Sequence, residues 1–188
     1  MPSQPKKLLT PEEYLILERK TKFKSEYFAG EMFARAGASR QHNLIAANII
    51  RTLGNQLLER NCNVYPSHMR VKISKINKYT YPDIVVACGE EQFEDEQHDT
   101  LLNPAVIIEI LSESTEAYDR GKKFEHYQSL ESLAEYLLVS QDPYRMEQYI
   151  RQDESTWTYS EFHHAEDVVQ LRTIDCELAL KDVYAKVA

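Results

Sequence analysis

The sequence predicts an α/β or α+β fold in which helices pack on a central mixed sheet. Two short apolar runs, residues 81–88 and 103–112, lack polar alternation and therefore indicate strands that are buried on both faces. Helical patterns precede the first run and follow the second. The predicted order is helix, strand, strand, strand, helix, strand, within a single domain that covers residues 1–188.

A short helix and a hairpin are predicted near the N-terminus. Thr10 is placed to cap the helix, because Pro11 suits the first helical position and Glu13 completes a capping box. The glycine-containing stretch that follows predicts a β-hairpin with its turn at Ala29–Gly30 or at Gly30–Glu31. Both elements come before the helix and strands of the expected core.

A long helix is expected over residues 39–60, because apolar residues recur there every four positions. Its buried stripe consists of Ile45, Ile49, Leu53 and Leu57, and His42 lies on the same stripe. Residues 63–74 predict a strand with one face in the core and a basic, solvated face. The two faces carry, respectively, Met69, Val71 and Ile73, and Arg70, Lys72 and Ser74.

The second half of the chain predicts one more helix and several strands. Ser114–Thr115 offers an N-cap for a helix that runs to about Ser129. A strand is expected over residues 135–140, followed by a turn at Asp142–Pro143. The remaining elements are expected to be antiparallel strands at 146–152 and 156–162, a further strand at 168–173, and a short helix within 178–187.

The charge of the chain is unevenly distributed. A net charge of −8 predicts low affinity for DNA by bulk attraction, because phosphate contacts need Lys and Arg. Residues 90–99 hold six acids and no base, which is typical of a solvated loop. Residues 60–78, in contrast, hold no acid and form a local basic strip. Its members are Arg60, Arg70, Lys72, Lys75 and Lys78.

The cysteines and the hydropathy pattern indicate a cytoplasmic protein that does not enter a membrane. No stretch is long and apolar enough to span a bilayer. Cys62, Cys88 and Cys176 are odd in number, far apart and never spaced as CxxC. They are expected to be reduced, partly buried thiols rather than a zinc site or a disulfide framework.

Two carboxylates in the apolar runs are the candidate site. Glu109 lies inside an apolar strand, where an unpaired charge costs several kcal/mol, so it requires a salt bridge, access to water or a metal. Asp83 lies at the start of the other run. If the two strands pair, their carboxylates converge and repel each other. A divalent cation such as Mg²⁺ or Mn²⁺, or a shared proton, would resolve that repulsion.

Three further residues are candidates on weaker grounds. Lys123 shares a helix face with Asp119 and Tyr127, and it either is a solvated charge or faces the acids from the next helix. Glu26 by itself indicates an exposed strand acid, and His42 on its apolar stripe indicates a hydrogen-bonded core residue. Both become candidates only if the fold brings them to the acid pair.

The chain resembles the PD-(D/E)XK phosphodiesterase superfamily, which includes many restriction and repair nucleases and has an αβββαβ core. Pro82–Asp83 matches its first motif step, and Glu109 matches its second acid. The resemblance is closer to the Uma-type group of restriction-endonuclease-like proteins and extends from the first helix to the last. The matching segments are EYFAGE, RQHNLIAANI, YPDIVVA, VIIEILSEST and YDRGKKFEHYQSLESLAEYLLV.

This resemblance implies a metal-dependent DNA endonuclease. It implies that Asp83 and Glu109 bind Mg²⁺ or Mn²⁺ and that Glu26 and His42 are accessory residues. Leu111 stands where the superfamily motif has lysine, and the lysine of the group corresponds here to Lys123, near the nucleophilic water. Cutting both strands of a duplex predicts a two-fold homodimer. The alternative is a catalytically inactive nuclease-like fold that serves as a binding or regulatory module.

Overall fold

The computed structural model describes residues 8–35, 37–113, 115–142 and 144–187. Its largest sheet has six strands in the order β11-β10-β9-β8-β6-β3. Their bounds are β3 (Cys62–Pro66), β6 (Ile84–Cys88), β8 (Val106–Ile110), β9 (Glu135–Val139), β10 (Met146–Arg151) and β11 (Trp157–Phe162). The pair β8–β9 is parallel and the other neighbouring pairs are antiparallel, so the sheet is mixed, as predicted.

The predicted helix and strand order of the core is confirmed. Helix α2 (Arg40–Gln56) precedes β3, and its cap is the side chain of Ser39. The connection from β8 to β9 is helical. It consists of α3 (Glu116–Tyr118), a π-helical turn (Asp119–Lys123) and α4 (Phe124–Tyr127). The predicted cap at Ser114–Thr115 and the predicted turn at Asp142–Pro143 each include a residue that lies outside the described ones.

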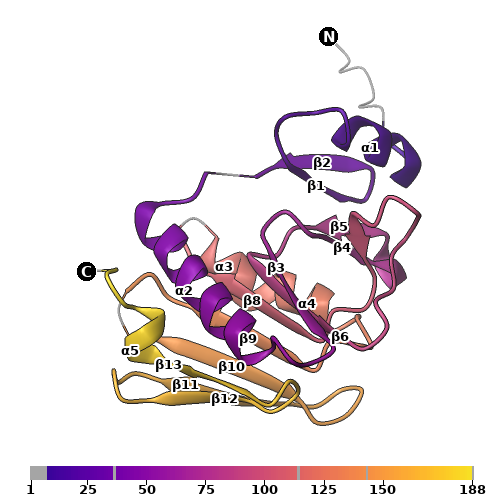
Figure 1. The fold of residues 1–188 in the computed structure, drawn as a ribbon. Helices are drawn as coiled ribbons and strands as arrows, with labels where there is room; N and C mark the ends of the chain where they lie inside the picture. The colour runs from indigo at the N-terminus through magenta and orange to yellow at the C-terminus, as the bar shows by residue number, and fades with distance from the viewer. Residues whose placement is uncertain (1–7, 36, 114, 143, 188) are drawn as a thin grey trace.

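Both faces of the six-stranded sheet are covered. Helix α2 lies across one face (Figure 1), and its predicted stripe is almost completely buried there. The same core contains side chains from β12 (Val168–Leu171), β13 (Cys176–Ala179) and α5 (Leu180–Val183). On the other face, side chains of β6, β8 and β9 pack with Tyr127 of α4. Strands β6 and β8 are therefore buried on both faces, as their lack of alternation predicted.

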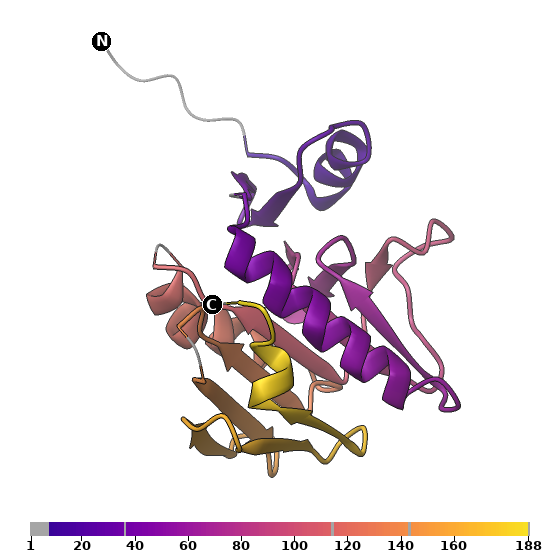
Figure 2. The ribbon, with the colours of Figure 1, turned by 60° about the vertical axis from the view of Figure 1, so that its left-hand side comes forward.

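The N-terminal helix and hairpin form as predicted and join a second sheet. This sheet has the order β2-β1-β5-β4-β7, and Figure 2 shows the hairpin and α1 set apart from α2. The bounds are α1 (Pro11–Glu18), β1 (Ser25–Phe28), β2 (Glu31–Ala34), β4 (Arg70–Ile73), β5 (Lys78–Thr80) and β7 (Thr100–Leu101). The hairpin turn requires Gly30, because its φ is +86° and a Cβ there would lie 2.7 Å from Leu8 Cβ.

The prediction of one continuous strand over residues 63–74 is wrong. A turn closed by the hydrogen bond from Met69 N to Pro66 O, 3.1 Å long, separates β3 from β4. The two strands then enter different sheets, because β3 pairs with β6 and β4 pairs with β5 and β7. The alternation that predicted a strand belongs to the second half of this segment.

The basic, solvated face predicted for residues 63–74 is wrong for Arg70, and most bases of the strip at 60–78 pair with acids elsewhere in the chain. Arg70 is only 2% exposed and pairs with Asp99 at 2.8 Å. Arg60 pairs with Asp175, Lys72 with Glu94 and Lys75 with Glu131. Lys78 contacts Tyr118 and His126. These partners are distant in sequence, so the local pattern could not reveal them.

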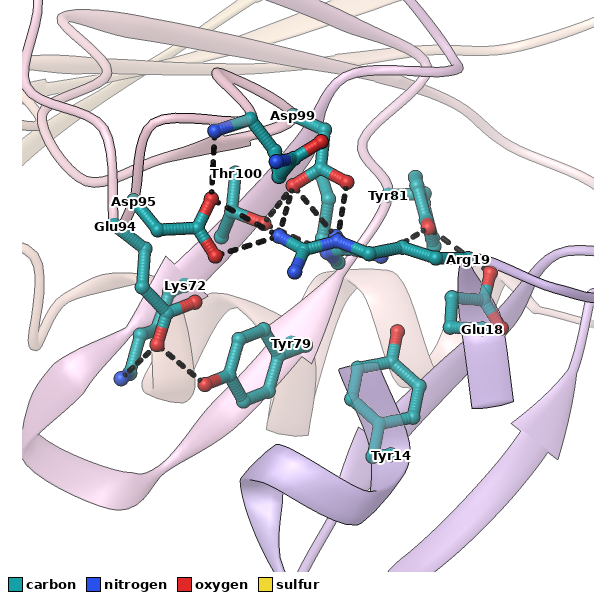
Figure 3. A network of polar contacts seen from close by, with 12 residues as sticks. Tyr14, Glu18, Arg19, Lys72, Tyr79, Tyr81, Glu94, Asp95, Asp99 and Thr100 are labelled. Carbon is teal, nitrogen blue, oxygen red and sulfur yellow. Dashed lines mark hydrogen bonds and ion pairs between the residues drawn. The ribbon is translucent and has the colours of Figure 1, made fainter. Parts of the chain in front are cut away.

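The acidic segment at 90–99 is a largely exposed loop, as its composition predicts, and some of its acids also make tertiary contacts. Arg19, the residue after α1, contacts Asp95 at 2.7 Å and Asp99 at 2.9 Å (Figure 3). Glu94 in the same segment accepts a hydrogen bond from Tyr79 Oη of β5 at 2.7 Å. These contacts attach α1 to the second sheet and thereby fix the position of the hairpin that follows it.

Cys62 and Cys88 form a disulfide, so the prediction of three reduced thiols is wrong. The antiparallel pairing of β3 with β6 places the two cysteines directly opposite each other. A separation of 26 residues hides this pairing in the sequence. Cys176 is a buried free thiol, as predicted. Disulfides are typical of oxidising compartments, so the cysteines no longer support the predicted cytoplasmic location.

The helices that the structure describes are too short or too polar to cross a membrane. Among the described residues, none of the helices combines the length and the apolar character that crossing a bilayer requires.

The disulfide predicts a specific labelling pattern. Alkylation of the denatured, unreduced protein should modify Cys176 alone, and prior reduction should expose Cys62 and Cys88 as well. Intact-mass spectrometry measures the number of adducts. Reduction should also lower the free energy of unfolding by about 3 kcal/mol, because it releases the loop that the bond closes. Three adducts without reductant would contradict the disulfide.

Candidate functional site

The two predicted acids face each other on neighbouring strands. In the antiparallel ladder of β6 and β8, Ile84 pairs with Ile108, so the next step of the register sets Asp83 opposite Glu109. Side chains at these positions point to the face of the sheet that packs against α4. The two residues are 6% and 2% exposed, so both carboxylates are held away from bulk water.

Asp83 is surrounded by hydrogen-bond donors. Its carboxylate accepts hydrogen bonds from Ile110 N at 2.9 Å and Arg35 Nη2 at 3.2 Å, and His42 Nε2 lies 3.0 Å from it. Burial by itself would raise the pKa of Asp83, but His42 and the Ile110 amide outweigh burial and hold that pKa below its usual value. Asp83 is therefore ionised at neutral pH.

Glu109 has the opposite electrostatic environment. Lys123 Nζ and Tyr127 Oη both lie 2.8 Å from Glu109 Oε1. Burial raises the pKa of Glu109 to about 8, and the Lys123 ammonium opposes that rise without cancelling it. Two opposed carboxyl groups with pKa values shifted in opposite directions are typical of sites that handle protons or metal ions.

The helix after β8 directs Lys123, and not Lys122, toward the acids. Lys123 is 8% exposed and also contacts Asp119 at 3.0 Å. Lys122 is 56% exposed and pairs with Glu125 at the surface. The π-helical turn holds Asp119 and Lys123 on one face, as their spacing predicted. Lys123 thus contacts Glu109 directly, although it lies on the helix that follows β8 and not on the strand itself.

The two accessory candidates lie on either side of the acid pair. His42, in the first turn of α2, contacts Asp83 directly. Glu26 Oε1, on β1, accepts a hydrogen bond from Thr80 Oγ1 at 2.7 Å, and Thr80 Oγ1 lies 3.5 Å from Tyr127 Oη. Glu26 is therefore linked to Glu109 through two hydroxyl groups. The fold brings together all five residues that the sequence singled out.

Sequence reasoning missed Arg35 and Thr80 and underestimated Tyr127. The four-residue spacing of Tyr127 from Lys123 was a usable signal, because it places both side chains on one helix face. Arg35 follows β2 and contacts Asp83, which lies 48 residues further along the chain. No local pattern marks Arg35 or Thr80, so only the tertiary structure identifies them.

The donor set fits a hard divalent cation. The described residues contain no group of three or more His, Cys, Asp and Glu side chains arranged to hold a metal. Mg²⁺, however, keeps several waters and uses one or two carboxylates plus substrate phosphates. Asp83 and Glu109 provide such a pair, and restriction-endonuclease-like families generally use divalent metals.

Comparison with known proteins assigns the family. A family model named Uma2 and described as "Putative restriction endonuclease" matches residues 11–181. The chain belongs to the Uma2 family. Two relatives from Synechocystis sp. strain PCC 6803 are similar along most of their length. Protein slr1290 is 34% identical, and the alignment covers the whole of this chain and 97% of the relative. Protein sll1609 is 37% identical, and the alignment covers 82% of this chain and 88% of the relative.

A solved structure supports the Uma2 fold. It is described as a "putative nuclease belonging to DUF820" from Anabaena variabilis and matches this chain with a TM-score of 0.78. The alignment covers 96% of this chain and 99% of that one, with 20% identity. At this identity the likeness establishes the restriction-endonuclease-like fold, and the nuclease-like assignment rests on the Uma2 family.

The raised pKa of Glu109 predicts a pH-dependent stability in the absence of metal. Its folded-state pKa of about 8 exceeds the ordinary glutamate value of 4.5, so the folded state binds more protons between these two pH values. Its contribution is complete below about pH 4.5 and is lost as the pH rises through 8, at up to about 1.4 kcal/mol per pH unit. Urea denaturation at several pH values, compared with Glu109→Gln, isolates this slope. Equal pH profiles for the two proteins would show that Glu109 is not responsible.

Proposed function

We propose that this Uma2 protein is a metal-dependent DNA endonuclease that hydrolyses phosphodiester bonds. The observation that carries the proposal is the contact of Lys123 Nζ with Glu109 Oε1, beside Asp83 on the neighbouring strand. An acid pair with an adjacent ammonium is the minimum set for phosphodiester hydrolysis in the superfamily that the chain resembles. It is present here although the motif lysine is replaced by Leu111.

Asp83 and Glu109 would hold Mg²⁺ or Mn²⁺. The bound cation would lower the pKa of a water molecule and offset charge on the scissile phosphate. Asp83 is already ionised and is oriented by the Ile110 amide and His42. Glu109 gives up its proton more readily beside the Lys123 ammonium, which opposes the effect of burial.

Lys123 would act on the reacting groups directly. Glu109 and Asp119 hold its ammonium in place from two sides, so it loses little freedom when substrate binds. From that position an ammonium can orient the attacking water or stabilise charge that grows on a phosphate oxygen. Arg35 has a 26% exposed side chain beside Asp83 and offers a second cation for the DNA backbone.

One observation favours the alternative, a nuclease-like fold without turnover. The protein supplies its own cations to both acids, Arg35 at Asp83 and Lys123 at Glu109, and His42 also contacts Asp83. Such a cluster is electrostatically satisfied without a metal, so it could also be a structural feature of a binding module. Metal binding and cleavage therefore have to be tested separately.

Cleavage should depend on the buried Lys123 and not on an exposed surface lysine. Supercoiled plasmid incubated with the protein and Mg²⁺ or Mn²⁺ should be nicked, and a chelator should stop the reaction. Lys123→Gln should reduce nicking at least about 100-fold, because electrostatic stabilisation by one group is typically worth that much. Lys181→Gln is the matched control and should retain activity, since its side chain is exposed on α5. Unchanged nicking by the Lys123 variant would refute the assigned role.

The metal proposal predicts a thermal shift that requires Glu109. Mg²⁺ at roughly 100 times its dissociation constant should stabilise the protein by about 2.7 kcal/mol. The shift should be larger at about pH 8 than at about pH 5, because protons compete for Glu109 below its pKa of about 8. Melting curves of wild type and Glu109→Gln, with Mg²⁺ or chelator, measure this difference. An identical Mg²⁺ response in both proteins would exclude Glu109 as a ligand.

A further inference from the structure

A pocket of about 290 Å³ opens beside Glu26. Its aromatic walls are Phe28, Phe33 and Tyr118, and its polar groups are Glu26, Lys78, Lys122 and His126. The volume is near the lower end of the range for small-molecule sites. The lining combines flat apolar faces with hydrogen-bonding groups, which is unlike a purely apolar cavity.

The hairpin builds one wall of this pocket. Glu26 and Phe28 are two residues apart on β1 and therefore point to the same side. Phe33 on β2 is the register partner of Glu26, so it lies on that side as well. Phe33 is 49% exposed and Tyr118, on the facing helix α3, is 41% exposed. Two aromatic rings are therefore accessible at the pocket, on separate elements.

Lys78 places a desolvated cation at the pocket. Its side chain is 2% exposed, and its polar contacts within the described residues are Tyr118 Oη at 2.5 Å and His126 Nδ1 at 3.1 Å. The ammonium also lies 5.8 Å from the ring centre of Phe28 and 5.1 Å from that of Tyr118. Neither of its hydrogen-bonding partners carries a negative charge. The Glu26 carboxylate lines the same pocket and attracts Lys78 through space. The ammonium has three N–H donors, so the third remains for an anion that enters the pocket.

The pocket is joined to the candidate site by Glu26. The same carboxylate that lines the pocket accepts the hydrogen bond from Thr80, whose hydroxyl approaches Tyr127 and thereby Glu109. A molecule in the pocket would therefore contact Glu26 and be connected to Glu109 through Thr80 and Tyr127. Because the pocket is connected to the candidate site, its occupant is expected to be a part of the substrate and not an unrelated ligand.

We propose that this pocket binds one unpaired base of a nucleic acid strand, between the exposed rings of Phe33 and Tyr118, with Lys78 attracting the adjoining phosphate. The inference rests on the proposed function and specifies its substrate as single-stranded or locally unpaired DNA. Aromatic side chains stack on every base, and a base inside a duplex cannot reach such a pocket without leaving the helix. The apolar faces bind the ring, and Glu26 and His126 can hydrogen-bond to its edge.

The test measures binding without catalysis. Fluorescence anisotropy in the presence of a chelator compares three labelled probes of roughly 16 nucleotides: a single strand, a duplex, and an abasic single strand with the same backbone. The wild-type protein should bind the base-containing single strand more tightly than the other two. Phe33→Ala should weaken single-strand binding about tenfold and leave duplex binding unchanged. Phe33→Trp should restore binding, because it retains an aromatic face.

A matched control distinguishes the loss of base stacking from the loss of any exposed apolar side chain. Leu58→Ala removes another exposed apolar side chain, 79% exposed just beyond α2, and should leave all three affinities unchanged. Equal affinity for base-containing and abasic strands, or no effect of Phe33→Ala, would overturn the inference. Nicking activity without pocket-dependent binding would overturn it while leaving the proposed function intact. Pocket-dependent binding without nicking under any metal would support the pocket and reject the endonuclease.

Discussion

The register between β6 and β8 is the constraint on which the candidate site depends. It sets Asp83 opposite Glu109 on one face of a sheet that is otherwise apolar. Two such carboxylates are stable together only because the surrounding structure treats them differently. The Ile110 amide and His42 stabilise the ionised form of Asp83, whereas Glu109 is buried against Lys123 and Tyr127. A one-residue slip would send the acids to opposite faces and dismantle the site.

The second sheet completes the site from the other side. Its hairpin contributes Glu26 and, just beyond β2, Arg35, while β5 contributes Thr80. Contacts between Arg19 and the acidic segment hold α1 and the hairpin in place, as Figure 3 shows. Some of the acids that give the chain its negative charge thus form ion pairs that hold the structure together. The resulting surface pocket has aromatic walls and a buried lysine in an otherwise acidic protein.

Substitution of the motif lysine by Leu111 illustrates how geometry can preserve a chemical group. Leu111 is buried in the core beside β8 and contributes packing. The ammonium arrives instead from the following helix, where the π-helical turn ends at Lys123. Under the proposed function, phosphodiester hydrolysis would require an ammonium near Glu109 rather than a lysine at a given sequence spacing. A spatial criterion therefore identifies this site more securely than the short motif does.

The sequence by itself determined the helix and strand order, the buried stripe of α2, the capping box of α1 and the identity of the two acids. These features depend on local periodicity and on the cost of burying charge, which neighbouring residues reveal. Only the tertiary structure decided the split between β3 and β4, the neutralisation of Arg70 and the contact of Arg35 with Asp83. It also decided the Cys62–Cys88 disulfide. Each of these depends on partners far apart in the chain, which strand pairing brings together and no local pattern encodes.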